Sequence, residues 1–235
     1  MEIVHKSLCQ REEIEKILKF RVRNIQLYQE ALLHKSAVKL YDVQLSNERL
    51  EFIGDSVLNL IIARWIYDSY PTENEGFMTK LRTRIVSGQC LAKLASNLEL
   101  HKYIRMNDKA LRQGWNTNPR ILEDTFEAII GALYLDQGIQ KTTEYIINDL
   151  LTQLDITGML VDTNYKDILM RYTQSNNNKL PEYTIIREDG PNHNKQFVVS
   201  VSIETNAIGE GVAKSKKQAE QHAAYHALQC MGLIS

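Results

Sequence analysis

The stretch NERLEFIGDSVLNL, residues 47–60, places acidic side chains inside an apolar helical pattern. Glu51 and Asp55 are four residues apart, so both carboxylates lie on one helix face, where like charges repel by a few tenths of a kcal/mol. Gly54 falls beside this pair on a helical wheel of about 100° per residue. Because glycine has no side chain, the pattern predicts that another helix approaches closely at this face.

A second stretch, ILEDTFEAIIGALYL at residues 121–135, repeats the arrangement. Asp124 and Glu127 are three residues apart and share a helix face. Ala128 and Gly131 lie beside them and are again small. The two stretches therefore predict a pair of helices that pack against each other with their acidic pairs on adjoining faces.

Four carboxylates that meet between two helices require either a cation or large upward pKa shifts. Hard oxygen ligands select magnesium, manganese or calcium. The alternative is that the acids lie on solvated helix faces. Such faces normally alternate acids with Lys or Arg, whereas an apolar run follows Glu127. From the residues alone both interpretations stay open.

The rest of the chain divides in two by hydrophobic period. Residues 11–154 repeat apolar positions at helical spacing, including a helix from about 120 to 135 that ends near Gly138. From residue 162 onward a short helix, 165–174, precedes alternating segments at 183–187, 197–203 and 209–213, and a final helix covers 216–231. The last helix has an alanine-rich face suited to packing on a small antiparallel sheet.

Bulk properties restrict the class of protein. The net charge of −1 does not by itself indicate a nucleic-acid ligand, so any evidence for one must be local. The charged N-terminal stretch has no apolar core of the kind that a signal peptide needs, and no segment is long enough to span a membrane. Cys9, Cys90 and Cys230 have no metal-binding spacing, which favours a reducing, cytoplasmic compartment without structural zinc.

The motifs resemble those of the ribonuclease III family. NERLEFIGDSVL is similar to its signature, and LEDTFEAIIGALYLDQG is similar to its second acidic motif. Two further segments, ALLHKS (31–36) and NEGFMTKLR (74–82), are also similar to the family and stand in the family's order along the chain. The segments GPNHNKQFVV (190–199) and KSKKQAEQHAA (214–224) are similar to double-stranded-RNA-binding domains. The resemblance implies an α plus α+β fold. We expect an all-helical catalytic and dimerisation domain (1–154), a linker (155–162) and an α-β-β-β-α double-stranded-RNA-binding domain (163–235).

The resemblance also implies roles for individual acids. Glu51 and Asp124 are expected to bind the metal, and Asp55 and Glu127 are expected to be catalytic and associated with it. The expected cofactor is Mg²⁺, with Mn²⁺ as a possible substitute. Further residues with an implied role are Glu48 and Glu75, which help to place the scissile strand, and Phe52, a contact across a homodimer for which an ordinary core position is the alternative.

For the second domain the resemblance implies binding to double-stranded RNA. Lys214, Lys216 and Lys217 stand at the start of the last helix, whose positive dipole end already favours phosphate. His193 matches a loop position that reaches the minor groove, although a lone loop histidine is otherwise merely solvated. Gln174 matches a contact on the first helix, but Met170 and Arg171 replace the Gln-Glu pair common in the family, and Arg171 is a candidate for a phosphate contact instead.

The sequence therefore predicts a metal-dependent endoribonuclease. The resemblance implies that it cuts double-stranded RNA to staggered products with 5′-phosphate and 3′-hydroxyl ends and acts as a homodimer, and no membrane partner is expected. The first alternative is a non-cleaving protein that sequesters duplex RNA, and the second is an interaction scaffold with a degenerate nuclease fold. Because all four expected acids are present, the cleaving enzyme is favoured.

Overall fold

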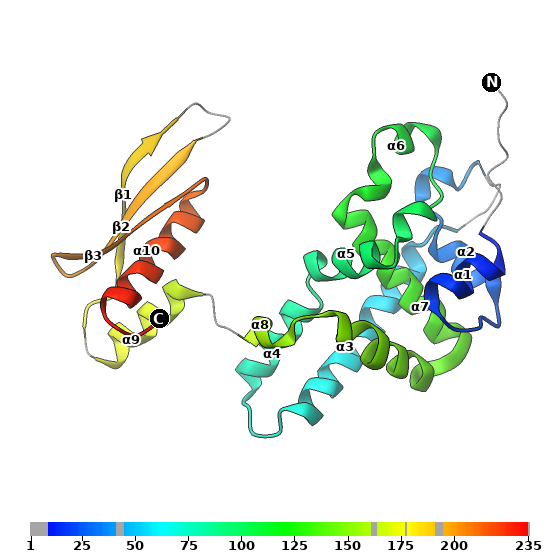
Figure 1. Ribbon diagram of the computed structural model, residues 1–235, viewed down its shortest axis with the longest axis horizontal. Helices are drawn as coiled ribbons and strands as arrows, with labels where there is room; N and C mark the ends of the chain where they lie inside the picture. Colours follow the sequence, from blue (N-terminus) through cyan, green and yellow to red (C-terminus); the bar gives the residue numbers. More distant parts are fainter. Residues whose placement is uncertain (1–8, 41–44, 161–163, 177, 191–194, 235) are drawn as a thin grey trace. The chain divides into compact units, whose positions relative to one another are not determined.

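The computed structural model describes residues 9–40, 45–160, 164–176, 178–190 and 195–234. The chain forms two compact units, Met1–Leu160 and Val161–Ser235, shown in Figure 1. The first is helical, and the second has the order helix, three strands, helix, so the predicted fold class is confirmed. Among the described residues, no helix has both the length and the apolar character needed to cross a bilayer.

The first unit consists of helices connected by short turns. Its α-helices are α1 (Arg11–Leu18), α2 (Ile25–Ala31), α3 (Glu48–Ser69), α4 (Glu75–Ile85), α5 (Gly88–Asn97), α6 (Asp108–Arg112), α7 (Pro119–Tyr145) and α8 (Ile156–Leu160). Short 3₁₀ or π turns lie at η1 (Lys35–Ala37), η2 (Leu100–Lys102), η3 (Trp115–Thr117), η4 (Ile146–Leu150) and η5 (Leu151–Gln153). One hydrophobic core connects these elements, with α3 and α7 at its centre.

Helices α3 and α7 approach each other at their glycines. A Cβ built on Gly54 would stand 1.8 Å from the carbonyl oxygen of Glu127, and one built on Gly131 would stand 2.1 Å from the carbonyl oxygen of Leu50. Ala128 between them is fully buried. Any larger side chain at these positions would push the helices apart. The close approach predicted from the small residues is therefore present.

Helix α7 begins where the sequence predicts and continues further. The Asn118 side chain accepts a hydrogen bond from the Arg120 amide at 2.9 Å, and Pro119 occupies the first turn, where its missing N–H costs nothing. Gly138 has φ 82° and interrupts the helical backbone at the predicted end, but the chain resumes a helix up to Tyr145. Gly138 is thus a kink within α7 and not its terminus.

Helix α8 lies inside the stretch 155–162 for which a linker was expected. It packs against α4 in the first unit, and the Arg84 guanidinium donates a hydrogen bond to the carbonyl oxygen of Met159. The ordered chain of the first unit therefore extends to Leu160. Residues 161–163 lie outside the described part.

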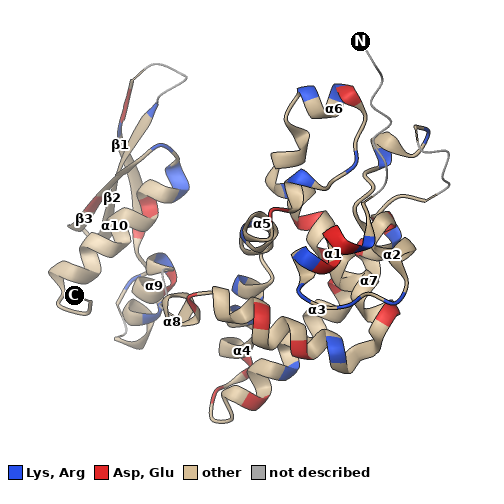
Figure 2. Ribbon diagram, turned by 45° about the vertical axis from the view of Figure 1, so that its right-hand side comes forward, with Lys and Arg blue, Asp and Glu red and all other residues tan. Residues whose placement is uncertain are grey.

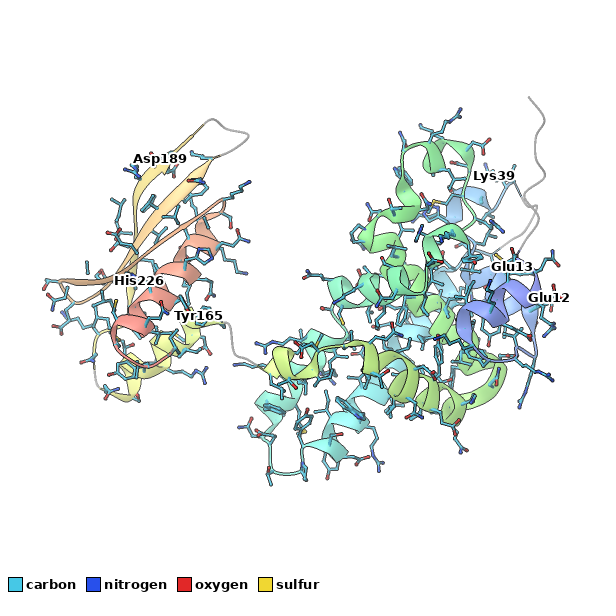
Figure 3. The ribbon with its side chains drawn as sticks, in the orientation of Figure 1. Glu12, Glu13, Lys39, Tyr165, Asp189 and His226 are labelled. Carbon is cyan, nitrogen blue, oxygen red and sulfur yellow. The ribbon has the colours of Figure 1, made fainter. Side chains whose placement is uncertain are left out.

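The second unit packs two helices on one face of an antiparallel sheet with strand order β1-β2-β3. Its elements are α9 (Tyr165–Ser175), β1 (Glu182–Asp189), β2 (Gln196–Ile203), β3 (Asn206–Ala213) and α10 (Lys216–Cys230). The predicted alanine face of α10 is buried against β3, where Cβ atoms on Gly209 and Gly211 would stand 2.5 and 2.2 Å from α10 carbonyl oxygens. Tyr165, labelled in Figure 3, joins α9 to α10 through the ring of Tyr225, 4.8 Å away between centroids.

Candidate active site

Three of the four predicted carboxylates face one hollow between α3, α5 and α7. This carboxylate hollow, of about 810 Å³, is lined by Glu51 of α3 and by Glu123, Asp124 and Glu127 of α7. The first residue of α5, Gly88, forms part of the opposite wall, and a Cβ there would stand 2.3 Å from a Glu123 carboxylate oxygen. The close packing of α3 on α7 therefore directs acids from two helices into one space.

The electrostatics of the carboxylate hollow are those of crowded, partly buried acids. Burial, together with the charges of Asp55, Glu123, Glu51 and Asp124, raises the pKa of Glu127 to about 8. Burial is also the main cause that raises the pKa of Glu51 and of Asp124. Without a cation, at least one of these groups must hold a proton near neutral pH. This is the behaviour expected of acids that converge between helices.

Asp55 lies at the edge of this arrangement. Its side chain is exposed and does not line the carboxylate hollow. The Asn59 side-chain amide donates a hydrogen bond to its Oδ1 at 2.8 Å. Nevertheless, among the charged groups that raise the pKa of Glu127, Asp55 has the largest effect. The structure thus brings Asp55 into electrostatic reach of Glu127, although Asp55 does not line the hollow.

The donor set suits a hard divalent cation. Carboxylate oxygens are the ligands preferred by magnesium, manganese and calcium, and no sulfur or imidazole competes among the residues that line the carboxylate hollow. The side chains as they stand in the described residues do not form a ready cluster of three or more metal ligands. The raised pKa of Glu127 indicates that a bound cation would relieve the repulsion among these acids.

A second hollow, here called the indole hollow, adjoins the first. It measures about 550 Å³ and shares Glu51, Asp124 and Arg120 with the carboxylate hollow. Glu48 lines it, accepts a hydrogen bond from Ser46 at 3.0 Å and forms a 3.2 Å ion pair with Lys35. These hydrogen bonds lower the pKa of Glu48 and keep it ionised. Glu48 therefore lies beside the other acids, as predicted.

Glu75 is not brought to this site within the single chain. It is the first residue of α4, is exposed, and accepts a hydrogen bond from the Thr79 hydroxyl at 2.8 Å. It lines neither the carboxylate hollow nor the indole hollow. Its expected place beside the scissile strand stays a prediction.

Phe52 is exposed in the single chain, in contrast to the alternative of an ordinary core phenylalanine. Its side chain is 77% exposed, one residue from the acids of the hollow. Leu60 and Tyr67 of the same helix are also exposed, at 61% and 65%. Helix α3 thus presents large apolar side chains to solvent, and such surfaces mark contacts with other proteins.

Three lysines of the second unit, Lys214, Lys216 and Lys217, lie at the start of α10, where Figure 2 shows one of the basic segments of this unit. Ser215 caps this helix by accepting a hydrogen bond from the Gln218 amide. Lys214 and Lys217 are exposed, whereas Lys216 forms a 3.3 Å ion pair with Glu188 and lies over the Phe197 ring. Two of the three predicted lysines are thus available for phosphate without the loss of an ion pair within the described residues.

The first helix of this unit places its candidate RNA contacts on the surface. Gln174 is exposed, and Met170 is 39% exposed. Arg171 forms a 3.0 Å ion pair with Asp167 one turn earlier, so a phosphate contact by Arg171 would have to compete with that pair. His193 lies outside the described residues.

Comparisons with known proteins match both units. Residues 24–154 match the family model described as ribonuclease-III-like, which covers more than half of the chain. The chain belongs to the ribonuclease III family. Residues 165–231 match the double-stranded RNA binding motif, which continues the family arrangement to the end of α10.

Similar proteins come from bacteria and a virus. A putative protein of Paramecium bursaria Chlorella virus 1 is 40% identical over 95% of this chain and 80% of its own length. Ribonuclease 3 of Listeria innocua is 38% identical over 92% of this chain and 96% of its own length. A solved nuclease domain of ribonuclease III from Campylobacter jejuni is 33% identical, with a TM-score of 0.57, and the match covers 61% of this chain and 97% of that domain. Its description concerns a flexible region involved in dimer formation.

Ribonuclease III enzymes depend on a divalent metal ion, which agrees with the oxygen donors of the carboxylate hollow. The charged residues of that hollow that were not singled out from the sequence are Lys93, Arg120 and Glu123. Arg120 precedes Asp124 by four and Glu127 by seven positions, so helical spacing alone could have placed it on the same face. Glu123 precedes Glu127 by four positions, so the same spacing could have placed it, but its contact with Gly88 depends on how α5 packs against α7.

Proposed function

We propose that this protein is a magnesium-dependent endonuclease that cuts double-stranded RNA. The observation that supports this most strongly is the carboxylate hollow, in which Glu51, Asp124 and Glu127 from two helices face one space. The same chain contains a motif for binding duplex RNA. A hollow in which acids outnumber basic side chains, joined to a module for a polyanion, fits an enzyme in which a metal ion mediates between the two.

Glu51, Asp124 and Glu127 would hold Mg²⁺, or Mn²⁺ in its place, and Asp55 would complete the catalytic group from the edge of the hollow. When bound, the cation supplies a water of lowered pKa and neutralises charge on the phosphate. Water attacks phosphorus in line, the bond from phosphorus to the 3′-oxygen breaks, and that oxygen leaves as a hydroxyl. The 5′-phosphate keeps the oxygen of the water. Glu48 and Glu75 would position the strand that is cut.

The cleavage of both strands requires two such sites. The chain has one carboxylate hollow in its described part, so a homodimer would supply the second. The exposed Phe52 on α3 supports a dimer contact, as does the similarity to a nuclease domain whose description mentions dimer formation. Two sites related by two-fold symmetry would cut the strands at staggered positions.

The second unit would hold the duplex without reading much sequence. A-form RNA hides its base edges in a deep major groove, so recognition relies on phosphates, 2′-hydroxyls and shape. Lys214, Lys216 and Lys217 would meet phosphate at the positive end of α10, and Gln174 and His193 would reach the minor groove. The three cysteines are free thiols, which supports activity in a reducing compartment such as the cytoplasm.

An assay of metal dependence tests this proposal. We expect long duplex RNA to be cut to short duplexes in Mg²⁺ and to be bound without cutting in Ca²⁺, with cleavage lost in EDTA. The alternative is a non-cleaving protein that sequesters duplex RNA. Binding in both metals without a magnesium-dependent product would support that alternative and contradict the proposal.

A further inference from the structure

We propose that the indole hollow is a nucleotide subsite, in which Trp115 packs against one nucleoside of the cut strand and Arg120 contacts an adjoining phosphate. This inference rests on the proposed function, because it names the part of the substrate that lies next to the scissile phosphate. It assigns substrate-binding roles to Trp115 and Arg120, neither of which belongs to the acidic motifs.

The position of the indole hollow places it beside the proposed chemistry. It shares Glu51, Asp124 and Arg120 with the carboxylate hollow, so the two spaces meet at these side chains. Its volume of about 550 Å³ lies in the usual range for a small-molecule site, roughly 300–1,000 Å³. A strand whose phosphate lies among the acids therefore has room for a neighbouring nucleoside within one continuous surface.

Trp115 gives this space a flat apolar wall. The indole is 44% exposed and lies at the start of η3, directly after Gly114, whose φ of 72° turns the chain there. One edge contact holds it, from the His34 ring at a centroid distance of 6.3 Å and an angle of 84°. The other residues that line this hollow are mainly charged and polar, so packing within the protein does not explain why Trp115 is exposed here.

His34 forms a rigid support for Trp115. Its backbone amide donates to the carbonyl oxygen of Arg105 at 3.0 Å, and its Nδ1 accepts from the Ser36 amide at 3.2 Å. The residue after Trp115 is also held in place, because the Asn116 side-chain amide donates a hydrogen bond to the carbonyl oxygen of His101 at 3.0 Å. An indole held in this way loses little conformational freedom when a ligand packs on it.

The charges of the indole hollow suit a phosphate at one end only. Arg120 is exposed, lines both hollows beside Glu51 and Asp124, and forms no ion pair within the described residues. Lys35, the other cation, already pairs with Glu48 at 3.2 Å. Arg120 is therefore a cation that lines both hollows without an ion pair in the described residues, and its planar fork matches phosphate oxygens.

A nucleotide matches this combination better than an acidic peptide does. Nucleic-acid strands alternate a phosphate with a flat or ring-shaped apolar unit, and aromatic side chains gain about 1–3 kcal/mol per stacked base. An acidic peptide would bring a second carboxylate towards Glu48, Glu51 and Asp124, where like charges repel. The geometry thus points to one nucleotide of the RNA strand.

Tryptophan fluorescence tests the subsite directly. The chain has two tryptophans, and Trp65 packs against Tyr70 at 6.2 Å, so Trp65→Phe leaves Trp115 as the only reporter. Duplex RNA added to this variant in Ca²⁺ should quench or shift the Trp115 emission, while Trp115→Phe, which keeps Trp65, should give no response. Unchanged Trp115 emission in a complex that a gel shift shows to be formed would overturn the subsite.

Substitutions distinguish a substrate contact from a structural role. Trp115→Ala should raise KM for cleavage about tenfold, while Trp115→Phe restores most of the loss. Arg120→Gln should reduce the salt dependence of RNA binding by about one counterion, whereas Arg112→Gln, at an exposed position outside both hollows, should not. Equal salt dependence in the two arginine variants would overturn the proposal. If the parent cuts duplex RNA and these tests fail, the subsite is wrong but the proposed nuclease function remains supported. If the parent does not cut duplex RNA, the proposed function itself is wrong.

Discussion

The substitution Glu127→Gln should stabilise the metal-free protein at alkaline pH, even though it removes a proposed catalytic group. Burial and four neighbouring acids raise the pKa of Glu127 from an ordinary value of 4.5 to about 8. The folded state therefore binds this proton more tightly than the unfolded chain does. Below pH 4.5 the carboxyl is neutral in both states and costs nothing; between pH 4.5 and 8 stability falls as pH rises.

The size of the effect follows from the same shift. At about 1.36 kcal/mol per pH unit, the difference between 4.5 and 8 sets an upper bound of about 5 kcal/mol. Glu127 is only partly buried, so water screens its charge and reduces the expected penalty to about 1–2 kcal/mol. Glutamine keeps the size of the side chain and removes the charge.

Urea denaturation in EDTA at pH 5 and pH 8.5 measures this directly. The parent should lose stability between the two pH values, and Glu127→Gln should lose about 1–2 kcal/mol less. Glu144→Gln is the matched control, because Glu144 is an exposed acid of the same helix that pairs with Lys141. Added Mg²⁺ should stabilise the parent more than the Glu127 variant. A Glu127 variant whose stability follows the parent at both pH values would refute the account of crowded carboxylates.

Three further outcomes follow from the packing and the surfaces. Gly54→Ala should destabilise the protein by about 3 kcal/mol or more in urea denaturation, because backbone atoms of α7 occupy the space that the new Cβ would need. Gly76→Ala is the control: its Cβ would meet only a side-chain oxygen at 3.3 Å, so stability should change by less than about 1 kcal/mol. Phe52→Glu should shift the protein towards monomer in sedimentation velocity and lower cleavage, and a dimer of unchanged strength would remove Phe52 from the interface. Lys217→Gln should weaken duplex binding and lower the salt slope by about one, with Lys179→Gln as an exposed control that keeps the slope.

The sequence indicated the part of the site that depends on helical periodicity. Acid pairs at spacings of four and three, each beside a glycine, predicted both the close approach of α3 to α7 and the convergence of Glu51, Asp124 and Glu127. The prediction was possible because the repeat of the α-helix determines which residues share a helix face. The strands followed from the alternation of apolar and polar residues, and α10 followed from its alanine-rich face.

Other parts of the site depend on contacts between distant segments, which periodicity does not report. Trp115 and His34 come from different turns, so nothing in either local sequence indicated that their rings meet. Gly138 was expected to end a helix, but tertiary packing lets α7 resume beyond it, with Tyr145 buried in the core. Helix α8 formed in an expected linker because α4 offers a surface for it.

Single-turnover cleavage of a long RNA duplex by the parent and by Glu127→Gln, each shown to bind the RNA equally, tests the central claim most directly. With saturating enzyme and Mg²⁺, the parent should convert the duplex to short staggered products with 5′-phosphate ends, and Glu127→Gln should yield none. Cleavage by Glu127→Gln at the rate of the parent would place the chemistry outside the carboxylate hollow and contradict the account.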